Sequence, residues 1–341
     1  MKTREERERE LLNDGFVDAI KQQFVGKNCI IPEKYYLLIA DYIDSLSQVE
    51  NDLHVDPVMI AKMLPNVLKE IREDNLQGIH GITDNKTITM NSRLDYETNK
   101  LYFFHELTHA IQTRMIDNKE ICAFSDGKTG MFLTEGSTQF TAEILYHVSN
   151  GTNLQYRNQP GTVRGHYEHT PYSALSEYQL NGNILMLLGA SLGLELKDLL
   201  AMAYRSDGRQ MLKEMYEVFP ENNGKFEEFM FDLEKIYAID KCLIAGYGNQ
   251  LNGELVNIQM NGGQQFQGNI DSQGQLINKV ERELAANFIG FNDNEYIMSH
   301  WELVYNSLTN SQLKREFLSA INEVSLMQNA NNQTIGTSHS R

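Results

Sequence analysis

Two histidines and a glutamate stand in the pattern H-E-x-x-H at His105, Glu106 and His109. On an α-helix, positions i and i+4 lie one turn apart on the same face, so both imidazoles can reach a single Zn²⁺. The intervening Glu106 then lies beside the metal-bound water, where it can act as a general base. The pattern therefore predicts a zinc hydrolase, in which the metal lowers the pKa of water and Glu106 takes its proton.

The residues around the motif predict the helix that this chemistry needs. Asp95 is expected as its N-cap, and no proline or glycine interrupts residues 95–116. Apolar or small residues recur at three- and four-residue spacing, which is typical of a helix with one buried face. They are Leu101, Phe104, Thr108, Ile111 and Met115.

A catalytic zinc usually takes three protein ligands and keeps a fourth position for water, so a third ligand must follow the motif. A histidine six residues after His109 is excluded, because that position is Met115. A glutamate from a second helix is the remaining common solution. The next predicted helix, with Thr134 as its N-cap, carries two such residues, Glu135 and Glu143.

Glu135 is favoured over Glu143 as the third ligand because of its neighbour Gln139. That glutamine falls one turn after Glu135, where its amide can orient His105 or His109 from behind. Glu143 lies two turns after Glu135 on the same face and remains the competing ligand.

The two segments together resemble the gluzincin metallopeptidases, and the second is similar to the Glu-bearing helix of bacterial minimal gluzincin domains. The resemblance is carried by His105-Glu106-Leu107-Thr108-His109 and Glu135-Gly136-Ser137-Thr138-Gln139, within about residues 75–180. It implies a zincin-like fold, with His105, His109 and Glu135 as zinc ligands and Glu106 as general base. One departure is Gln139, which stands where the family often has a carboxylate, so zinc affinity or water activation is expected to be weaker.

The stretch before the motif contains a turn at Asp84-Asn85 and then an alternating β-branched run. In the resembled fold an edge strand above the zinc pairs with the extended substrate backbone. The best candidate for that substrate-binding edge is the run itself, and an ordinary hairpin strand is the equally good alternative. The run comprises Thr87, Ile88, Thr89, Met90 and Asn91.

A donor to the oxyanion of amide hydrolysis is expected in the segment 165–172, which is dense in histidine and tyrosine. Tyr172 and His169 are the favoured candidates there. Such residues also cluster on exposed loops without any catalytic role, and that alternative stays open.

Composition and charge limit the other classes of function. With 341 residues, 41% of them apolar, the chain can form a soluble globular protein of one or two domains. A net charge of −16 argues against nucleic acid or an anionic membrane as partner. The charged N-terminus lacks a signal-peptide core, and the three distant cysteines predict free thiols, so a cytoplasmic location is expected.

The expected fold is α+β and predominantly helical, with a small β-sheet in a zincin-like core. Helical periodicity in the N-terminal region, 1–74, covers residues 4–24, 34–48 and 57–74. The core is expected over 75–180, and a helical C-terminal region over 181–328. Within the latter, a Gly/Asn/Gln-rich insertion at 245–280 predicts weak strands at 254–260 and 274–277, and a disordered tail is expected at 329–341.

Two functions follow from these patterns. The favoured one is a zinc metallopeptidase that acts on a peptide or protein substrate. The alternative is a non-catalytic or regulatory zinc-binding protein that acts through a specific partner, which the amide at Gln139 and the missing secretion signal would suit. Against it, a structural zinc site is normally closed by a fourth Cys or His ligand.

Overall fold

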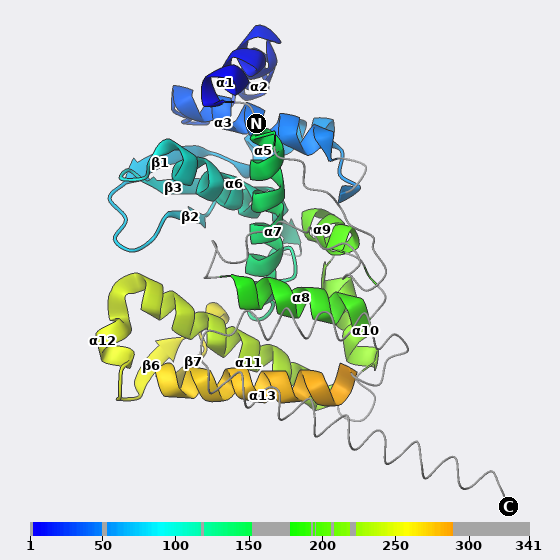
Figure 1. The fold of residues 1–341 in the computed structure, drawn as a ribbon, viewed down its shortest axis with the longest axis vertical. Helices are drawn as coiled ribbons and strands as arrows, with labels where there is room; N and C mark the ends of the chain where they lie inside the picture. Colours follow the sequence, from blue (N-terminus) through cyan, green and yellow to red (C-terminus); the bar gives the residue numbers. More distant parts are fainter. Residues whose placement is uncertain are drawn as a thin grey trace, which may run out of the picture.

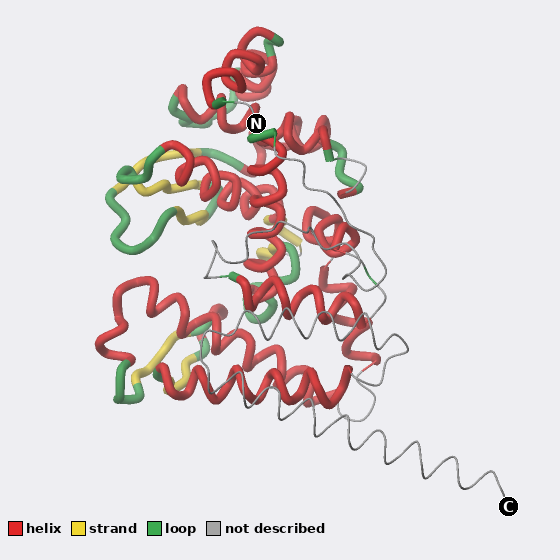
Figure 2. The backbone as a smooth tube through the Cα atoms, viewed as in Figure 1, coloured by secondary structure: helices red, strands yellow, loops and turns green. Residues whose placement is uncertain are grey.

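The computed structural model describes residues 3–49, 53–116, 119–151, 178–191, 194, 196–205, 208–218 and 223–288. This part of the chain is mostly helical and carries three small sheets, so the prediction of a predominantly helical α+β protein is confirmed at that level (Figures 1 and 2). Among its helices, none is both long and apolar enough to cross a lipid bilayer.

The N-terminal helices are α1 (Arg4–Asn13), α2 (Phe16–Phe24) and α3 (Glu33–Gln48). The helical periodicity predicted over residues 4–24 is divided between two helices, because Gly15 between α1 and α2 has a φ of +67°. That left-handed backbone suits glycine, which has no Cβ to clash with the carbonyl oxygen, and it turns the chain.

The helix expected over residues 57–74 is wrong in its second half. α5 (Pro57–Val67) ends early, because Pro65 has no N–H to donate to the preceding turn. Leu68 follows with an extended backbone, φ −128° and ψ 118°. The remaining residues form the strand β1 (Glu70–Asp74), which pairs in parallel with a strand further along the chain.

A three-stranded sheet contains β1, β2 (Gly81–Asp84) and β3 (Thr87–Asn91) in the order β1-β3-β2. β2 and β3 form an antiparallel hairpin, whose two-residue turn places Asn85 and Lys86 at φ +48° and +69°. Positive φ at both positions matches the right-handed twist of the flanking strands. β3 is therefore the central strand, so the prediction that Thr87–Asn91 is an edge strand is wrong, and β1 and β2 are the two edges.

The motif helix is α6 (Tyr96–Gln112), and the helix that follows it is α7 (Met131–Ser149). As predicted, Asp95 caps α6, because its carboxylate accepts from the Thr98 N–H at 2.9 Å. The predicted cap of α7 is wrong: the helix begins one turn before Thr134, behind Gly130, whose φ is +96°.

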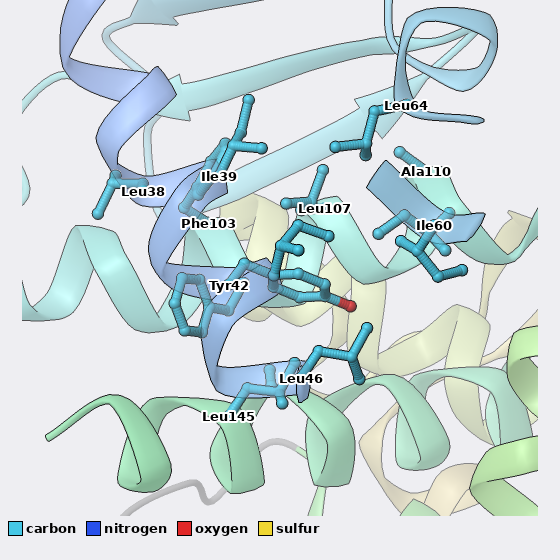
Figure 3. Close-up of a cluster of buried hydrophobic side chains, with 14 of the residues drawn as sticks. Leu38, Ile39, Tyr42, Leu46, Ile60, Leu64, Phe103, Leu107, Ala110 and Leu145 are labelled. Carbon is cyan, nitrogen blue, oxygen red and sulfur yellow. The ribbon is translucent and has the colours of Figure 1, made fainter. Parts of the chain in front are cut away.

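A hydrophobic core joins the N-terminal helices to α6 and α7 (Figure 3). Tyr42 of α3 stands at its centre, with its hydroxyl 2.9 Å from Thr108 Oγ1 on α6. The same cluster runs from Leu11 to Tyr204, and β1 belongs to the sheet of the predicted core. The boundary predicted at residue 74 therefore does not separate two hydrophobic cores.

Most of the remaining residues, 179–191, 208–218 and 223–288, lie in the lower half of the molecule in Figure 1. The remaining elements include two short hairpins. Residues 274–277, expected as a strand, lie inside a helix, whereas 254–260 contains the expected strand. The last part of the predicted helical C-terminal region, residues 289–328, and the expected tail lie outside the described residues. The elements are β4 (Thr113–Ile116), β5 (Lys119–Cys122), α8 (Gln179–Ser191), α9 (Leu196–Arg205), α10 (Gly208–Val218), α11 (Asn223–Cys242), η1 (Leu243–Tyr247), α12 (Gly248–Leu251), β6 (Val256–Gln259), η2 (Asn261–Gly263), β7 (Gln265–Gly268) and α13 (Ile270–Phe288).

Candidate metal centre

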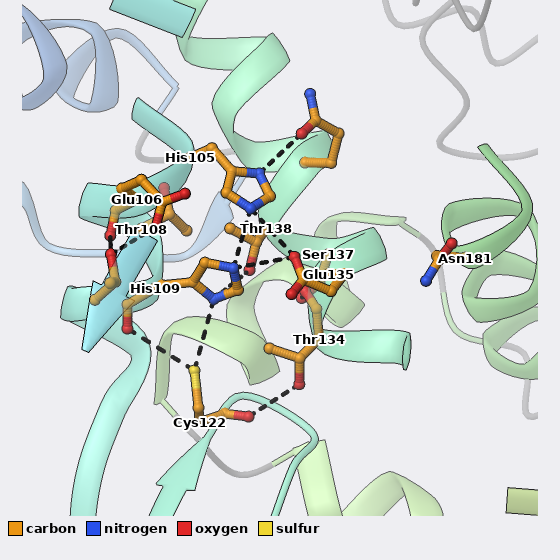
Figure 4. A network of polar contacts seen from close by, with 12 residues as sticks. His105, Glu106, Thr108, His109, Cys122, Thr134, Glu135, Ser137, Thr138 and Asn181 are labelled. Carbon is orange, nitrogen blue, oxygen red and sulfur yellow. Dashed lines mark hydrogen bonds and ion pairs between the residues drawn. The ribbon is translucent and has the colours of Figure 1, made fainter. Parts of the chain in front are cut away.

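The structure brings His105 and His109 of α6 together with Glu135 of α7 (Figure 4). All three side chains are buried, and one ligand atom from each lies within 4.8 Å of the others. The shorter contacts are 3.0 Å between the two histidine Nε2 atoms and 3.2 Å from each of these to Glu135 Oε2. A tetrahedral zinc with ligands at about 2.0–2.1 Å needs donor atoms about 3.3–3.5 Å apart. The donor set therefore fits a divalent ion of that size.

Partners on the outer side of each imidazole ring hold it in place. His105 Nδ1 lies 2.8 Å from Gln139 Oε1. Because an amide oxygen can only accept, Nδ1 carries the proton, and the Nε2 lone pair faces the cluster. His109 Nδ1 lies 3.4 Å from Thr138 Oγ1 and 3.9 Å from the sulfur of Cys122. Gln139 is thus placed as the sequence predicted, behind a ligand histidine.

The carboxylate of Glu135 is held by a residue that the sequence did not single out. Tyr237 of α11 donates its hydroxyl to Glu135 Oε1 at 2.5 Å, which leaves Oε2 for the histidine side. One turn earlier on α11, Glu234 Oε1 accepts from the N–H groups of Gly130 and Phe132, at the start of α7. α11 therefore positions both the beginning of α7 and the carboxylate of Glu135.

α8 crosses α7 at Gly136, the residue next to Glu135. A Cβ at Gly136 would lie 2.7 Å from the backbone of Asn181 and Gly182, so no larger residue fits without movement of a helix. Asn181 adds a hydrogen bond of 2.9 Å from its amide to the Phe132 carbonyl oxygen. α8 therefore packs against the face of α7 that carries Gly136, and Glu135 points from α7 toward the two histidines.

Glu106 lies outside the ligand cluster and against the edge strand β2. Its Oε2 accepts from the Thr83 hydroxyl at 2.7 Å, and the side chain is buried. A Cβ at Gly81 would lie only 2.7 Å from Glu106 Cγ, so the strand approaches the glutamate as closely as a glycine allows. β2 therefore fixes the position of the predicted base.

A cavity of about 670 Å³ opens beside these groups and is lined by β2, α6 and α11. His105, His109, Glu106 and Glu135 all border it. Tyr178, a second aromatic residue that the sequence did not single out, also lines the cavity and stacks on the His105 ring with centroids 5.4 Å apart.

The remaining predicted site residues lie elsewhere. The strand Thr87–Asn91 is not part of the cavity wall, and its backbone is used in pairing with β1 and β2. The edge strand that lines the cavity is instead β2 (Gly81–Asp84). Tyr172 and His169 lie outside the described residues.

The electrostatics of the cluster are those of a buried ion pair. Burial, the largest single influence, would raise the pKa of Glu135, but the positive charge that His109 can carry and the hydrogen bonds from both histidines hold it well below its usual range. Burial likewise lowers the pKa of His109, yet the Glu135 carboxylate outweighs it and the net pKa is well above the usual value. A metal ion would take the place of that proton.

Glu143, the competing ligand, is not part of the cluster. It lies two turns along α7, where its Oε1 accepts from Gln139 Nε2 at 3.4 Å. Burial raises the pKa of Glu143 to about 8.

No family model, curated protein or solved structure matches the chain, so no family is assigned to it.

Alanine substitutions distinguish the two glutamates as metal ligands. Changing His105, His109 or Glu135 to alanine should remove most of the bound divalent metal, because each is one of three ligands. Glu143→Ala should retain it. Metal content after dialysis measures this, and the ligand set is wrong if Glu143→Ala releases the metal while Glu135→Ala keeps it.

Glu143 also makes a contribution to stability that depends on pH. Its pKa is raised on folding from 4.5 to about 8, so the folded state binds the proton more tightly. The corresponding stability is complete below about pH 4.5 and is lost as the pH rises through about 8. For the metal-free protein, Glu143→Gln should flatten the dependence of the unfolding free energy on pH in this interval.

Urea unfolding at several pH values between these limits tests the expectation. Glu254→Gln is the matched control, because Glu254 is exposed and the change should leave the slope as in the wild type. The unfolding free energy of Glu143→Gln should still depend on pH to some extent, because burial also raises the pKa of Glu234, to about 7. Equal slopes in wild type and Glu143→Gln would contradict the prediction.

Proposed function

We propose that the protein is a zinc-dependent metallopeptidase, in which His105, His109 and Glu135 hold the metal and Glu106 is the general base. One observation carries the proposal. Glu106 stays out of the ligand cluster and yet borders the same cavity as the three ligand atoms. A core helix with two satisfied histidines would not need a cavity at that point.

The chemistry divides between the metal and the chain. A zinc ion held by His105, His109 and Glu135 would lower the pKa of water toward neutrality and would polarise a substrate carbonyl group. Glu106 accepts the proton that the attacking water loses and then delivers it to the leaving amine. The Thr83 hydroxyl at 2.7 Å steadies the carboxylate during both transfers.

The edge strand is the part of the cavity that we assign to the substrate backbone. β2 (Gly81–Asp84) pairs with β3 on one side, and no described strand pairs with its other edge. An extended peptide can add to such an edge through main-chain hydrogen bonds. Bound there, its carbonyl group would lie next to Glu106, because Gly81 and Thr83 both contact that side chain.

Among the described residues, the tyrosines that line the cavity are Tyr178 and Tyr237. The hydroxyl of Tyr237 donates to Glu135 and so belongs to the ligand cluster. Tyr178 stacks on His105, so it lies beside the position of the metal, and we assign to it the donor that stabilises negative charge on the carbonyl oxygen in the transition state.

The non-catalytic alternative is less well supported by the geometry. A structural zinc is normally closed by four protein ligands. Cys122 is the nearest additional sulfur, but it contacts His109 at Nδ1, the nitrogen that faces away from the cluster. The three-ligand set beside a cavity favours a site that keeps a position open for water.

Glu106→Gln separates metal binding from hydrolysis. The variant should keep about one zinc per chain and lose hydrolysis by roughly 10²- to 10⁴-fold, because the amide cannot accept a proton from water. Metal analysis and mass spectrometry of new peptide termini, after incubation of either protein with a proteome extract, measure both effects. Equal cleavage by wild type and variant would falsify the assignment of the base.

Gly81→Ala tests the contact between β2 and the base. The added Cβ would lie 2.7 Å from Glu106 Cγ, so the carboxylate must move while the ligand cluster stays intact. Zinc content should be unchanged, and hydrolysis should fall by up to about 100-fold, as for other small misplacements of a reacting group. Gly274→Ala, where an added Cβ meets no atom within 4 Å, is the control and should keep full activity.

A further inference from the structure

The charged side chains of the cavity wall contrast with the charge of the whole chain. The chain carries a net charge of −16. Among the described residues that line the cavity outside the metal cluster and Glu106, however, the charged ones are the cations Lys86, Arg114 and Lys241 and the acid Glu120. This part of the wall therefore carries more positive than negative side chains on a strongly acidic protein.

Arg114 is the most informative of these cations, because it is half-buried and its partners among the described residues are all neutral. Its guanidinium donates to the carbonyl oxygens of Ile111, Thr113 and Tyr204, the last two at 2.9 and 3.3 Å. Nη2 also contacts Met63 Sδ at 3.8 Å, so Nε–H is the donor for which the described residues offer no acceptor. No carboxylate of the described residues lies within ion-pair distance of it. Burial lowers the pKa of Arg114, opposed only by the Cys122 thiol. A buried charge is usually paired, so this one has room for an anion from outside.

Lys241 adds a second cation on the opposite wall. It stands in the last turn of α11, one turn after Tyr237, and its Nζ lies 5.2 Å from the centroid of that ring. The residue is exposed, so its charge is available to a ligand in the cavity. Lys86, at the tip of the β2–β3 hairpin, is already bonded to the Asn66 carbonyl oxygen at 2.7 Å.

We propose that the cavity selects peptides that place a carboxylate against Arg114 and Lys241, an inference that rests on the peptidase function proposed above. The carboxylate belongs to an acidic side chain near the scissile bond or to the C-terminus of the substrate. Both sources present the same planar group, which a guanidinium binds with charge-assisted hydrogen bonds. A bond to a charged partner of this kind corresponds to about a 10- to 100-fold change in affinity.

The test uses binding rather than turnover. Full-length Glu106→Gln protein is immobilised and incubated with a randomised peptide library in two forms, one with free and one with amidated C-termini. Retained peptides are identified by mass spectrometry. The same experiment is repeated with Arg114→Gln or Lys241→Gln added, and with Arg93→Gln as control, which removes an exposed positive charge outside the cavity.

The proposal expects retained peptides to be enriched about 10-fold or more in a carboxylate, and expects Arg114→Gln and Lys241→Gln to reduce that enrichment while Arg93→Gln keeps it. Enrichment in acidic side chains from both libraries identifies the side chain as the source. Enrichment confined to free C-termini identifies the chain end. No enrichment, or enrichment unchanged in both cavity variants, overturns the proposal.

Because Lys241 is exposed, its substitution should not disturb folding, and the test does not depend on Arg114→Gln alone. The outcome is also separable from the proposed function. If acidic peptides are retained but the protein with Glu106 does not cleave them, the peptidase assignment fails while the carboxylate specificity stands. If cleavage occurs without a preference for carboxylates, only the specificity fails.

Discussion

The burial of one carboxylate, that of Glu135, between two imidazoles is the interaction on which the rest of the structure depends. Each of these polar groups would be costly to bury by itself. The cost of burying them together is lower, because each neutralises or hydrogen-bonds another. Such an arrangement holds only if α6 and α7 keep their separation. The close crossing of α8 at Gly136 and the hydroxyl of Tyr237 on Glu135 are therefore part of the same construction as the ligands themselves.

The parts of the fold and site that could be predicted from the sequence are those set by local spacing. The i, i+4 relation places His105 and His109 on one face, Asp95 caps their helix, and Gln139 falls one turn after Glu135. Helical geometry transmits these relations without help from distant residues. The assignment of zinc and of peptide hydrolysis goes beyond such geometry and stays a prediction.

The parts that could not be predicted depend on contacts between distant segments. Ile71 continues the apolar spacing of α5, and only the pairing of β1 with β3 makes it a strand residue. The sequence predicts the turn at Asn85. Which strand of the hairpin lies at the edge of the sheet depends on the pairing of β1 with β3. Tyr237 stands 102 positions after the carboxylate that it bonds, and no local pattern marks it.

That separation of Tyr237 from Glu135 has a consequence for the order in which the protein is made. Ribosomes add about 5–20 residues per second, so Glu135 is synthesised about 5 to 20 seconds before the tyrosine that bonds it. During that interval the two histidines and the glutamate already exist, but α7 lacks both the Tyr237 hydroxyl and the Glu234 carboxylate at its start. The complete set of contacts around Glu135 can therefore form only after α11 has left the ribosome.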